Sequence, residues 1–179
     1  MKILGIDPGT QYTGFGIVIF KNNSFMLVKS GIIKPKTGDS ISSRLEFIFD
    51  EITNQIKIHN PDHFAIETAF YGKNIQSALK IGYVRGISLL AASKAGLPIG
   101  EYSPREVKKS VVGNGAASKE QVQYMIKKLL AIRIDKMRFD ESDALAVAVC
   151  HAFQTTSLKG AAGSWKKFAN ENPDRIIGA

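Results

Sequence analysis

The stretch Lys2-Ile-Leu-Gly-Ile-Asp-Pro-Gly-Thr-Gln-Tyr-Thr-Gly-Phe-Gly-Ile-Val-Ile-Phe20 predicts the centre of the fold. Its first part, Ile3 to Ile6, is a nearly continuous apolar run, which is typical of a strand buried on both faces. The pair Pro8-Gly9 then favours a turn, because proline fixes its own φ and glycine tolerates a positive φ. A second apolar run, Phe15 to Phe20, follows at hairpin distance. Asp7 is therefore predicted to stand at the end of a central strand.

The composition indicates one globular domain without a membrane span. The chain has 179 residues, of which 44% are hydrophobic and 22% are charged, enough for one domain with a real core. No apolar run approaches the roughly 20 residues that a spanning helix needs, and no secretory signal pattern opens the chain. The single cysteine, Cys150, lies in an Ala/Val-rich run, so we expect a buried, inert thiol and a cytoplasmic location.

The charge balance favours a polyanionic partner. Lys and Arg number 24 against 16 Asp and Glu, which leaves a net charge of +8. Such a surplus favours binding to nucleic acid, although many basic proteins bind none.

Hydrophobic periodicity predicts an α/β fold. Apolar runs predict further strands at 13–20, 25–33, 64–66 and 97–102, and the three N-terminal strands would form an antiparallel meander. The strand at 64–66 would lie parallel to the first strand, after a helical crossover. Helices are predicted at 41–56, 75–95 and 139–152, and two more begin at the capping patterns Ser103-Pro-Arg-Glu106 and Ser118-Lys-Glu-Gln121. We expect residues 1–157 to form the domain and 158–179 a loosely held tail.

Two smaller features have plain structural explanations. Gly82 and Gly86 are four residues apart in a predicted helix and would let another helix approach closely. We expect that helix to belong to the same monomer, and a dimer contact is the alternative. The histidines His59, His63 and His151 show no metal-ligand spacing and are interpreted as ordinary residues.

Four carboxylates stand at predicted element ends. Asp7 and Glu67 end two parallel strands, where open α/β sheets place their sites. Asp140 and Asp143 share a face in the first turn of a helix, although acids also occur there for dipole compensation alone. Four massed carboxylates would raise each other's pKa unless cations neutralise them, and oxygen ligands suit Mg²⁺ or Mn²⁺. Two such ions could activate a water and stabilise the leaving oxygen of a phosphodiester.

Other residues are candidates for nucleic-acid contact. Phe70 lies in a polar loop after Glu67 and would either stack on a base or tuck into the core. Lys108 and Lys119 flank a glycine-containing loop, where they would form either a phosphate-binding ridge or a solvated basic surface.

The motifs together resemble the RuvC-type Holliday junction resolvases, over roughly residues 1–155 and in the expected order. The stretches that carry the resemblance are Ile3-Leu-Gly-Ile-Asp-Pro-Gly-Thr10, Thr13-Gly-Phe-Gly16, Ala65-Ile-Glu67 with Phe70, Lys73-Asn-Ile-Gln-Ser-Ala-Leu-Lys80, Val107-Lys-Lys-Ser-Val-Val-Gly113 and Asp140-Glu-Ser-Asp-Ala-Leu-Ala146.

The resemblance implies an RNase H-like fold, a five-stranded mixed sheet flanked by helices, in a homodimer. It implies Mg²⁺-dependent, symmetric cleavage of four-way DNA junctions and cooperation with a branch-migration motor. The family's acidic positions fall on Asp7, Glu67, Asp140 and Asp143, and some members carry His where Asp140 stands. Its DNA-contacting positions fall on Phe70, Lys108 and Lys119.

Three other functions are weighed against this one. An RNase H-like nuclease that trims ribosomal RNA precursors shares the Asp-Pro-Gly start. Actin-like sugar kinases and chaperone ATPases also begin with a strand, an Asp and a glycine turn, but they need two related domains. The third alternative is a junction-binding module without catalysis.

Overall fold

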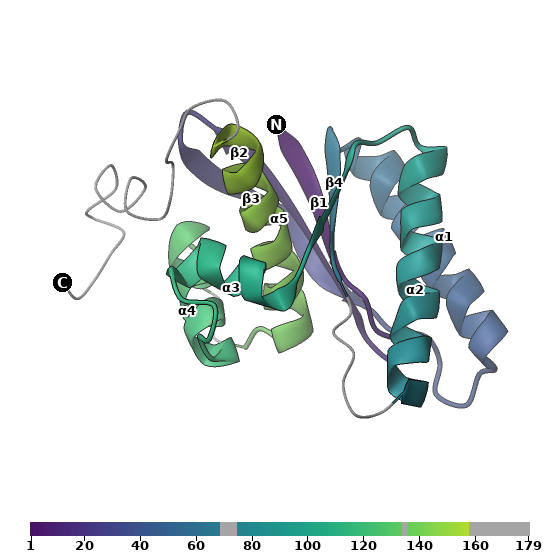
Figure 1. The fold of residues 1–179 in the computed structure, drawn as a ribbon. Coiled ribbons are helices and arrows are strands. Elements are labelled where there is room, and N and C mark those ends of the chain that lie inside the picture. The colour runs from purple at the N-terminus through teal and green to yellow at the C-terminus, as the bar shows by residue number, and fades with distance from the viewer. Residues whose placement is uncertain (69–74, 134–135, 158–179) are drawn as a thin grey trace.

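The computed structural model describes residues 1–68, 75–133 and 136–157, which form a five-stranded mixed sheet with helices on both faces (Figure 1). The spatial order of the strands is β3-β2-β1-β4-β5. The expected five-stranded mixed sheet flanked by helices is confirmed. The strands are β1 (Lys2–Asp7), β2 (Thr13–Lys21), β3 (Ser24–Ile33), β4 (His63–Glu67) and β5 (Ile99–Tyr102).

Strand pairing puts β1 at the centre. The antiparallel meander of β1, β2 and β3 is present, with Asp7 opposite Gly14 in the last pair of β1 and β2. On its other side β1 pairs in parallel with β4, through Ile6 and Ile66. The next strand, β5, pairs in parallel with β4, so that Glu67 faces Tyr102. The carboxyl ends of β1 and β4 therefore meet at one edge of the sheet.

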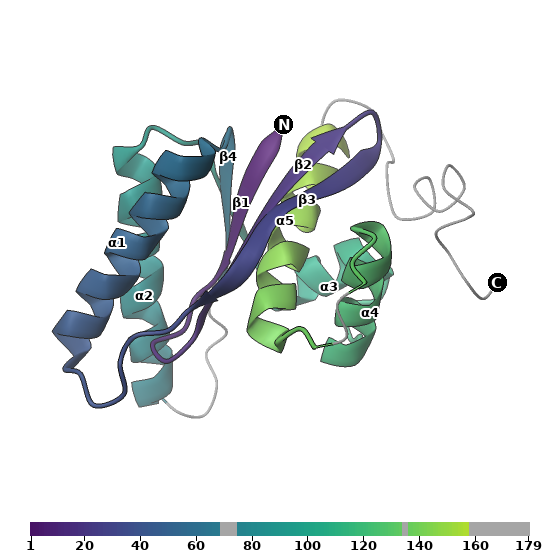
Figure 2. The ribbon, with the colours of Figure 1, turned by 180° about the vertical axis from the view of Figure 1, so that it is seen from behind.

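The helices cover the sheet in two layers (Figures 1 and 2). One face carries α1 (Ile41–His59) and α2 (Ile75–Lys94), and the other carries α3 (Pro104–Val112), α4 (Lys119–Leu129) and α5 (Phe139–Ser157). Strand side chains alternate between the layers: Leu4 and Ile6 pack with the core of α1 and α2, whereas Ile3 packs with that of α5. None of the helices in the described ranges is long and apolar enough to cross a membrane.

Three glycines let α5 lie directly against the sheet, and we call them the glycine seam: Gly5, Gly14 and Gly16. A Cβ at Gly14 would stand 1.8 Å from the carbonyl oxygen of Asp140, and one at Gly5 would stand 2.2 Å from that of Ala144. Any other residue would therefore push the helix away. The three glycines of the sheet, together with Ala144 and Ala148 of α5, therefore set the distance between the helix and the sheet.

The predicted helix starts are confirmed at α3 and α4. Ser103 and Ser118 each accept from the backbone N–H three residues later, and Glu106 and Gln121 complete the two capping boxes. The cysteine expected to be inert, Cys150, is fully buried, and burial raises its pKa to about 12.

The expectation for Gly82 and Gly86 was wrong. Both are exposed on α2, and a Cβ at either would meet nothing within 4 Å. No helix of the described chain packs on them, because α2 contacts α1 and the sheet through its other face, with Val84 and Ser88.

Two of the histidines that were interpreted as ordinary residues, His63 and His151, contact each other. His151 of α5 is buried, its Nε2 lies 2.9 Å from Nδ1 of His63, and its Nδ1 lies 2.8 Å from the hydroxyl of Tyr102. Burial, and then the charge of His63, lower the pKa of His151 to about 4. A neutral imidazole therefore links α5 to β4 and β5.

Candidate active site

Asp7 and Glu67 lie side by side at the edge where β1 and β4 end. Each comes one residue after the paired Ile6 and Ile66, so their strands are neighbours about 4.8 Å apart. Side chains alternate along a strand, and Asp7 and Glu67 therefore point to the same face as Ile3 and Ala65. That face is the one covered by α5.

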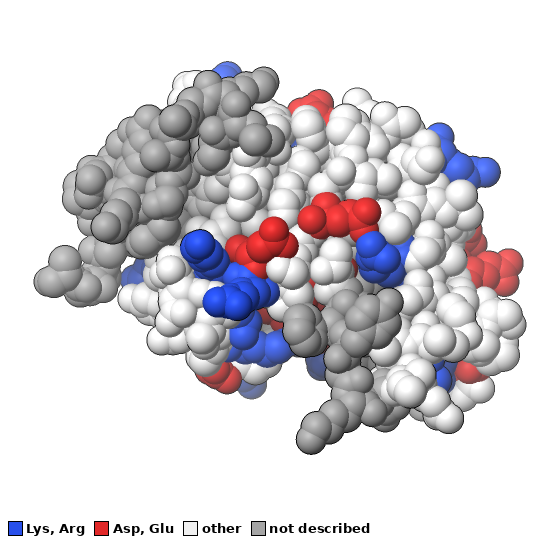
Figure 3. Space-filling model, in the orientation of Figure 1, with Lys and Arg blue, Asp and Glu red and all other residues white. Residues whose placement is uncertain are grey.

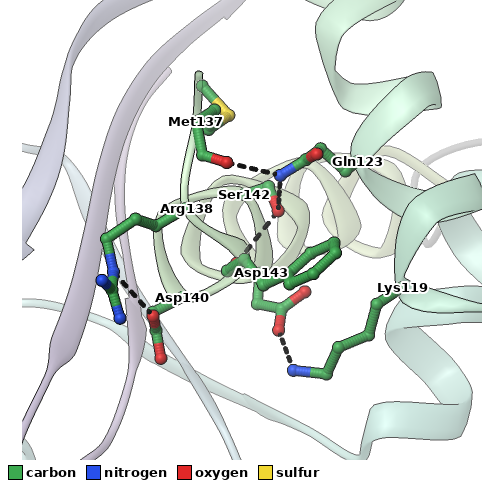
Figure 4. A network of polar contacts seen from close by, with 8 residues as sticks. Lys119, Gln123, Met137, Arg138, Asp140, Ser142 and Asp143 are labelled. Atoms are coloured by element: carbon green, nitrogen blue, oxygen red, sulfur yellow. Dashed lines mark hydrogen bonds and ion pairs between the residues drawn. The ribbon is translucent and has the colours of Figure 1, made fainter. Parts of the chain in front are cut away.

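The first turn of α5 brings two more acids to this edge. Gly14 stands opposite Asp7 in the sheet and admits the backbone of Asp140. Asp143 follows one turn later, and both side chains project to the same side of the helix (Figure 4). Carboxylates from three distant parts of the sequence, β1, β4 and the start of α5, therefore lie around the end of β1.

Burial and the neighbouring negative charges disfavour the charged form of Asp7, Glu67 and Asp143. The pKa of Asp7 is raised well above its usual value, mainly by burial and then by the charges of Glu67, Asp143 and Asp140. The pKa of Glu67 is raised to about 7, again by burial first and then by the charge of Asp143. The negative charges of Glu67, Asp140 and Asp143 therefore act on Asp7 across the site.

Lys119 offsets part of this repulsion. Its ammonium donates to Oδ2 of Asp143 at 2.6 Å (Figure 4). Burial raises the pKa of Asp143, and this ion pair opposes the rise. Burial alone would lower the pKa of Lys119, but Asp143, Asp7 and Glu67 raise it overall. The sequence predicted Lys119 only as part of a basic surface or a phosphate-binding ridge. In the structure its ammonium also forms an ion pair with one of the candidate site acids.

A polar network fixes the start of α5 to α4 (Figure 4). The amide of Gln123 donates to the carbonyl oxygen of Met137 at 3.0 Å and to the hydroxyl of Ser142 at 3.4 Å. The hydroxyl of Ser142 donates to the carbonyl oxygen of Phe139 at 2.9 Å. Because Ser142 precedes Asp143, this network holds the first turn of α5 in place.

Arg138 connects the site to the turn between β1 and β2. Its Nε donates to Oδ2 of Asp140 at 3.4 Å, and its guanidinium lies 4.0 Å from the ring centroid of Tyr12. Sequence reasoning identified neither Arg138, Tyr12, Gln123 nor Ser142. The only hint was the closeness of Arg138 to Asp140 along the chain.

Of the other residues predicted to contact DNA, Lys108 lies near the acids. Lys108 of α3 lowers the pKa of Glu67 and Asp143 through its charge, so it faces the same site. Basic side chains gather over the region of α3 and α4, next to acidic ones (Figure 3). Phe70 lies outside the described residues, and its role stays a prediction.

The donor set fits a hard divalent cation. Asp7, Glu67, Asp140 and Asp143 offer only oxygen atoms, the ligands that Mg²⁺ and Mn²⁺ prefer. The raised pKa values of Asp7, Glu67 and Asp143 are consistent with a site that favours added positive charge. Within the described ranges no three acidic, histidine or cysteine side chains are close enough to form a ready metal cage.

The mixed sheet and the helices on its two faces define an RNase H-like fold. Solved structures with the same fold include the yeast mitochondrial Holliday junction resolvase Ydc2, with a TM-score of 0.65 over 94% of this chain at 16% identity. A likeness at that identity establishes the architecture alone.

The family model described as "Crossover junction endodeoxyribonuclease RuvC" matches residues 3–151. Curated relatives of that name include one from Pelotomaculum thermopropionicum, 47% identical over 87% of this chain and 95% of its own length. Another, from Chloroherpeton thalassium, is 42% identical over 99% of this chain and 100% of its own. This chain belongs to the RuvC family of crossover junction endodeoxyribonucleases.

This chain is also similar in structure to a RuvC protein that was solved together with DNA. The structure of T. thermophilus RuvC in complex with a Holliday junction substrate matches with a TM-score of 0.81 and 31% identity, over 87% of this chain and 94% of that one.

Proposed function

We propose that this crossover junction endodeoxyribonuclease resolves Holliday junctions by paired symmetric nicks, with Asp7, Glu67, Asp140 and Asp143 as metal-binding catalytic residues. The observation that supports this assignment is the convergence of Asp7, Glu67 and Asp143, three partly buried carboxylates with raised pKa values, at the ends of β1 and β4. We propose two Mg²⁺ ions there, with Mn²⁺ as a substitute. Such ions supply an activated water and stabilise the leaving oxygen of the cleaved phosphodiester.

The residues of the chain itself orient the DNA. Lys108 and Lys119 stand beside the acids and attract the phosphate backbone, and Phe70 is proposed to stack on a base. The network of Gln123 and Ser142 keeps Asp143 aimed at the same point. Binding energy from the lysines thus positions the scissile phosphate over the carboxylates.

The direct test is a gel assay on a synthetic immobile four-way junction. We expect two symmetric, ligatable nicks with Mg²⁺ and no cleavage with EDTA, while a linear duplex of the same sequence stays intact. Preference for structured RNA would instead support an RNA-processing nuclease, and tight ATP binding an actin-like protein. Junction binding without cleavage under any divalent ion would indicate a purely binding module.

Replacing Lys119 by alanine is expected to weaken junction binding in a salt-dependent way. Each lost phosphate contact lowers the slope of log Kd against log salt concentration by about one. Fluorescence anisotropy across a salt series measures this slope, in EDTA to prevent cleavage. Lys21→Ala is the control, because Lys21 is exposed at the end of β2 that lies away from Asp7. An unchanged slope would leave Lys119 as a partner of Asp143 only.

We propose a homodimer built on the outer face of α2. Ile75, Leu79 and Tyr83 are 78%, 53% and 44% exposed on this helix, and Gly82 and Gly86 leave open space beside them. Large exposed apolar residues along one helix are unusual in a monomer, and glycines allow a second helix to approach closely. A two-fold dimer also presents two equal sites to two like-oriented strands.

Leu79→Glu is accordingly expected to dissociate the dimer and to abolish paired cleavage. Analytical ultracentrifugation measures the oligomeric state, and the gel assay separates single from paired nicks. Ile58→Glu is the matched control, since Ile58 is 63% exposed on α1 and lies off this face. Unchanged association of the Leu79 variant would place the dimer contact elsewhere.

Three further proposals follow from the family. Residues 1–157 form the nuclease domain, the protein works in the cytoplasm, where the buried Cys150 stays reduced, and a branch-migration motor delivers its substrate. Co-purification of a DNA-translocating complex with the tagged protein would support the last of these, and junction processing independent of any such complex would argue against it.

A further inference from the structure

A cavity of about 540 Å³ opens beside the acids, on the side away from Lys108 and Lys119. It is lined by the turn between β1 and β2, by the beginnings of α1 and α2, and by Asp140. That turn lies next to the first turns of α2 in both ribbon views (Figures 1 and 2). Because Asp140 lines it, the cavity borders the proposed active site.

Two cations line this cavity. Arg44 of α1 is partly buried, and its Nε donates to the carbonyl oxygen of Asp39 at 3.1 Å, which orients the guanidinium. Lys80 of α2 is exposed. No ion pair joins either side chain to an acid within the described part of the chain. We call this cavity the Arg44–Lys80 groove.

The groove continues into a second hollow of about 260 Å³, which shares Arg44 and Tyr12 with it. This hollow adds Lys34 and Lys36, and the ammonium of Lys34 lies 5.6 Å from the ring centroid of Tyr12. Four cationic side chains, Arg44, Lys80, Lys34 and Lys36, therefore line two adjoining hollows. A polymer with regularly repeated phosphates matches this arrangement better than a mononucleotide does.

We infer that the Arg44–Lys80 groove binds the sugar-phosphate backbone of junction DNA, on the opposite side of the scissile phosphate from Lys108 and Lys119. The inference rests on the junction-resolving function of the family and assigns a second DNA contact to this chain. DNA that crosses the acidic edge then has cations on both sides of it. These contacts offset the repulsion between the phosphates and the carboxylates, and they fix the strand at two points.

The test is a binding cycle with neutral phosphates. Fluorescent four-way junctions carry methylphosphonates either on the 5′ side or on the 3′ side of the cleavage point, and anisotropy in EDTA gives Kd across a salt series. The variants are Arg44→Gln, Lys80→Gln and the double variant, with Lys21→Gln as the control. Thermal melts verify that each variant folds.

We expect the double variant to lower the salt slope by about two, and Lys80→Gln alone to lower it by about one. Methylphosphonates on the side of the cleavage point that contacts the groove should weaken binding by the wild-type protein but not by the double variant. Methylphosphonates on the side that contacts Lys108 and Lys119 should weaken binding by both proteins equally. A salt slope equal to that of Lys21→Gln would overturn the inference, and so would equal sensitivity of wild type and double variant to neutral phosphates on both sides. Wild-type protein that fails to bind or cleave the junction would instead refute the proposed function.

Discussion

Asp7→Asn is expected to reduce junction cleavage by at least about 10³-fold, or about 4 kcal/mol of activation free energy, while junction binding is retained. Asp7 lies at the centre of the proposed site, where its pKa responds to the charges of Glu67, Asp143 and Asp140. Asparagine keeps the shape of the side chain but loses the charge that a divalent cation needs. Single-turnover cleavage and anisotropy, measured on the same protein, separate chemistry from binding.

The same substitution is expected to stabilise the metal-free protein. Asp7 and Glu67 have raised pKa values in the folded state, so the folded protein holds protons that the unfolded chain has already released. Its free energy of unfolding therefore falls as the pH rises from about 4.5 towards 7. Asp7→Asn removes one buried charge, and each kcal/mol gained raises Tm by about 2–4 °C in a chain of this size.

Melting curves in EDTA at about pH 5 and about pH 8 test this expectation. The Tm advantage of Asp7→Asn should be larger at the higher pH, where the wild-type acids are forced to ionise. Asp50→Asn, at an exposed position on α1, makes the same chemical change and should alter neither cleavage nor Tm. Cleavage at the wild-type rate by the Asp7 variant would remove Asp7 from the mechanism.

The second large effect is expected from Gly14→Ala. A methyl group there would stand 1.8 Å from the carbonyl oxygen of Asp140, and backbone atoms cannot rotate away as a side chain can. The first turn of α5 must therefore shift, and Asp140 and Asp143 shift with it. Overpacking of this kind costs about 1–3 kcal/mol of stability or more, and misplacement by about 1 Å can cost about 10²-fold in rate.

Gly31→Ala is the graded control. A Cβ at Gly31 would come within 2.9 Å of the far edge of the Phe15 ring, which can move. Its loss of stability in chemical denaturation should be clearly smaller, and its cleavage rate should stay near that of wild type. Equal losses for Gly14→Ala and Gly31→Ala would mean that the approach of α5 does not position the acids.

The sequence predicted those parts of the molecule that local patterns determine. Apolar runs located the strands, and the Ser103 and Ser118 capping boxes located the starts of α3 and α4. Asp7 and Glu67 were predicted to be neighbours because the ends of parallel strands share one edge. The predicted mixed sheet follows from the same patterns.

Contacts between distant segments could not be predicted in this way. The Lys119–Asp143 ion pair, the stacking of Arg138 on Tyr12 and the contact of His63 with His151 join residues far apart in sequence. Periodicity gives the face of an element but not the side chain that it meets. Gly82 and Gly86 show the same limit, because spacing alone does not say which helix, if any, fills the space beside them.

The glycine seam also restricts how this protein can diverge. Crowding between two side chains in a core can be relieved by making one of them smaller. At Gly5 and Gly14, however, the contacting atoms are the backbone carbonyl oxygens of Ala144 and Asp140 in α5. No second-site change can shrink a carbonyl group. In a randomised library selected for growth after DNA damage, codons 5 and 14 should return almost solely as glycine, even among survivors that have changed most of the outer surface of α1.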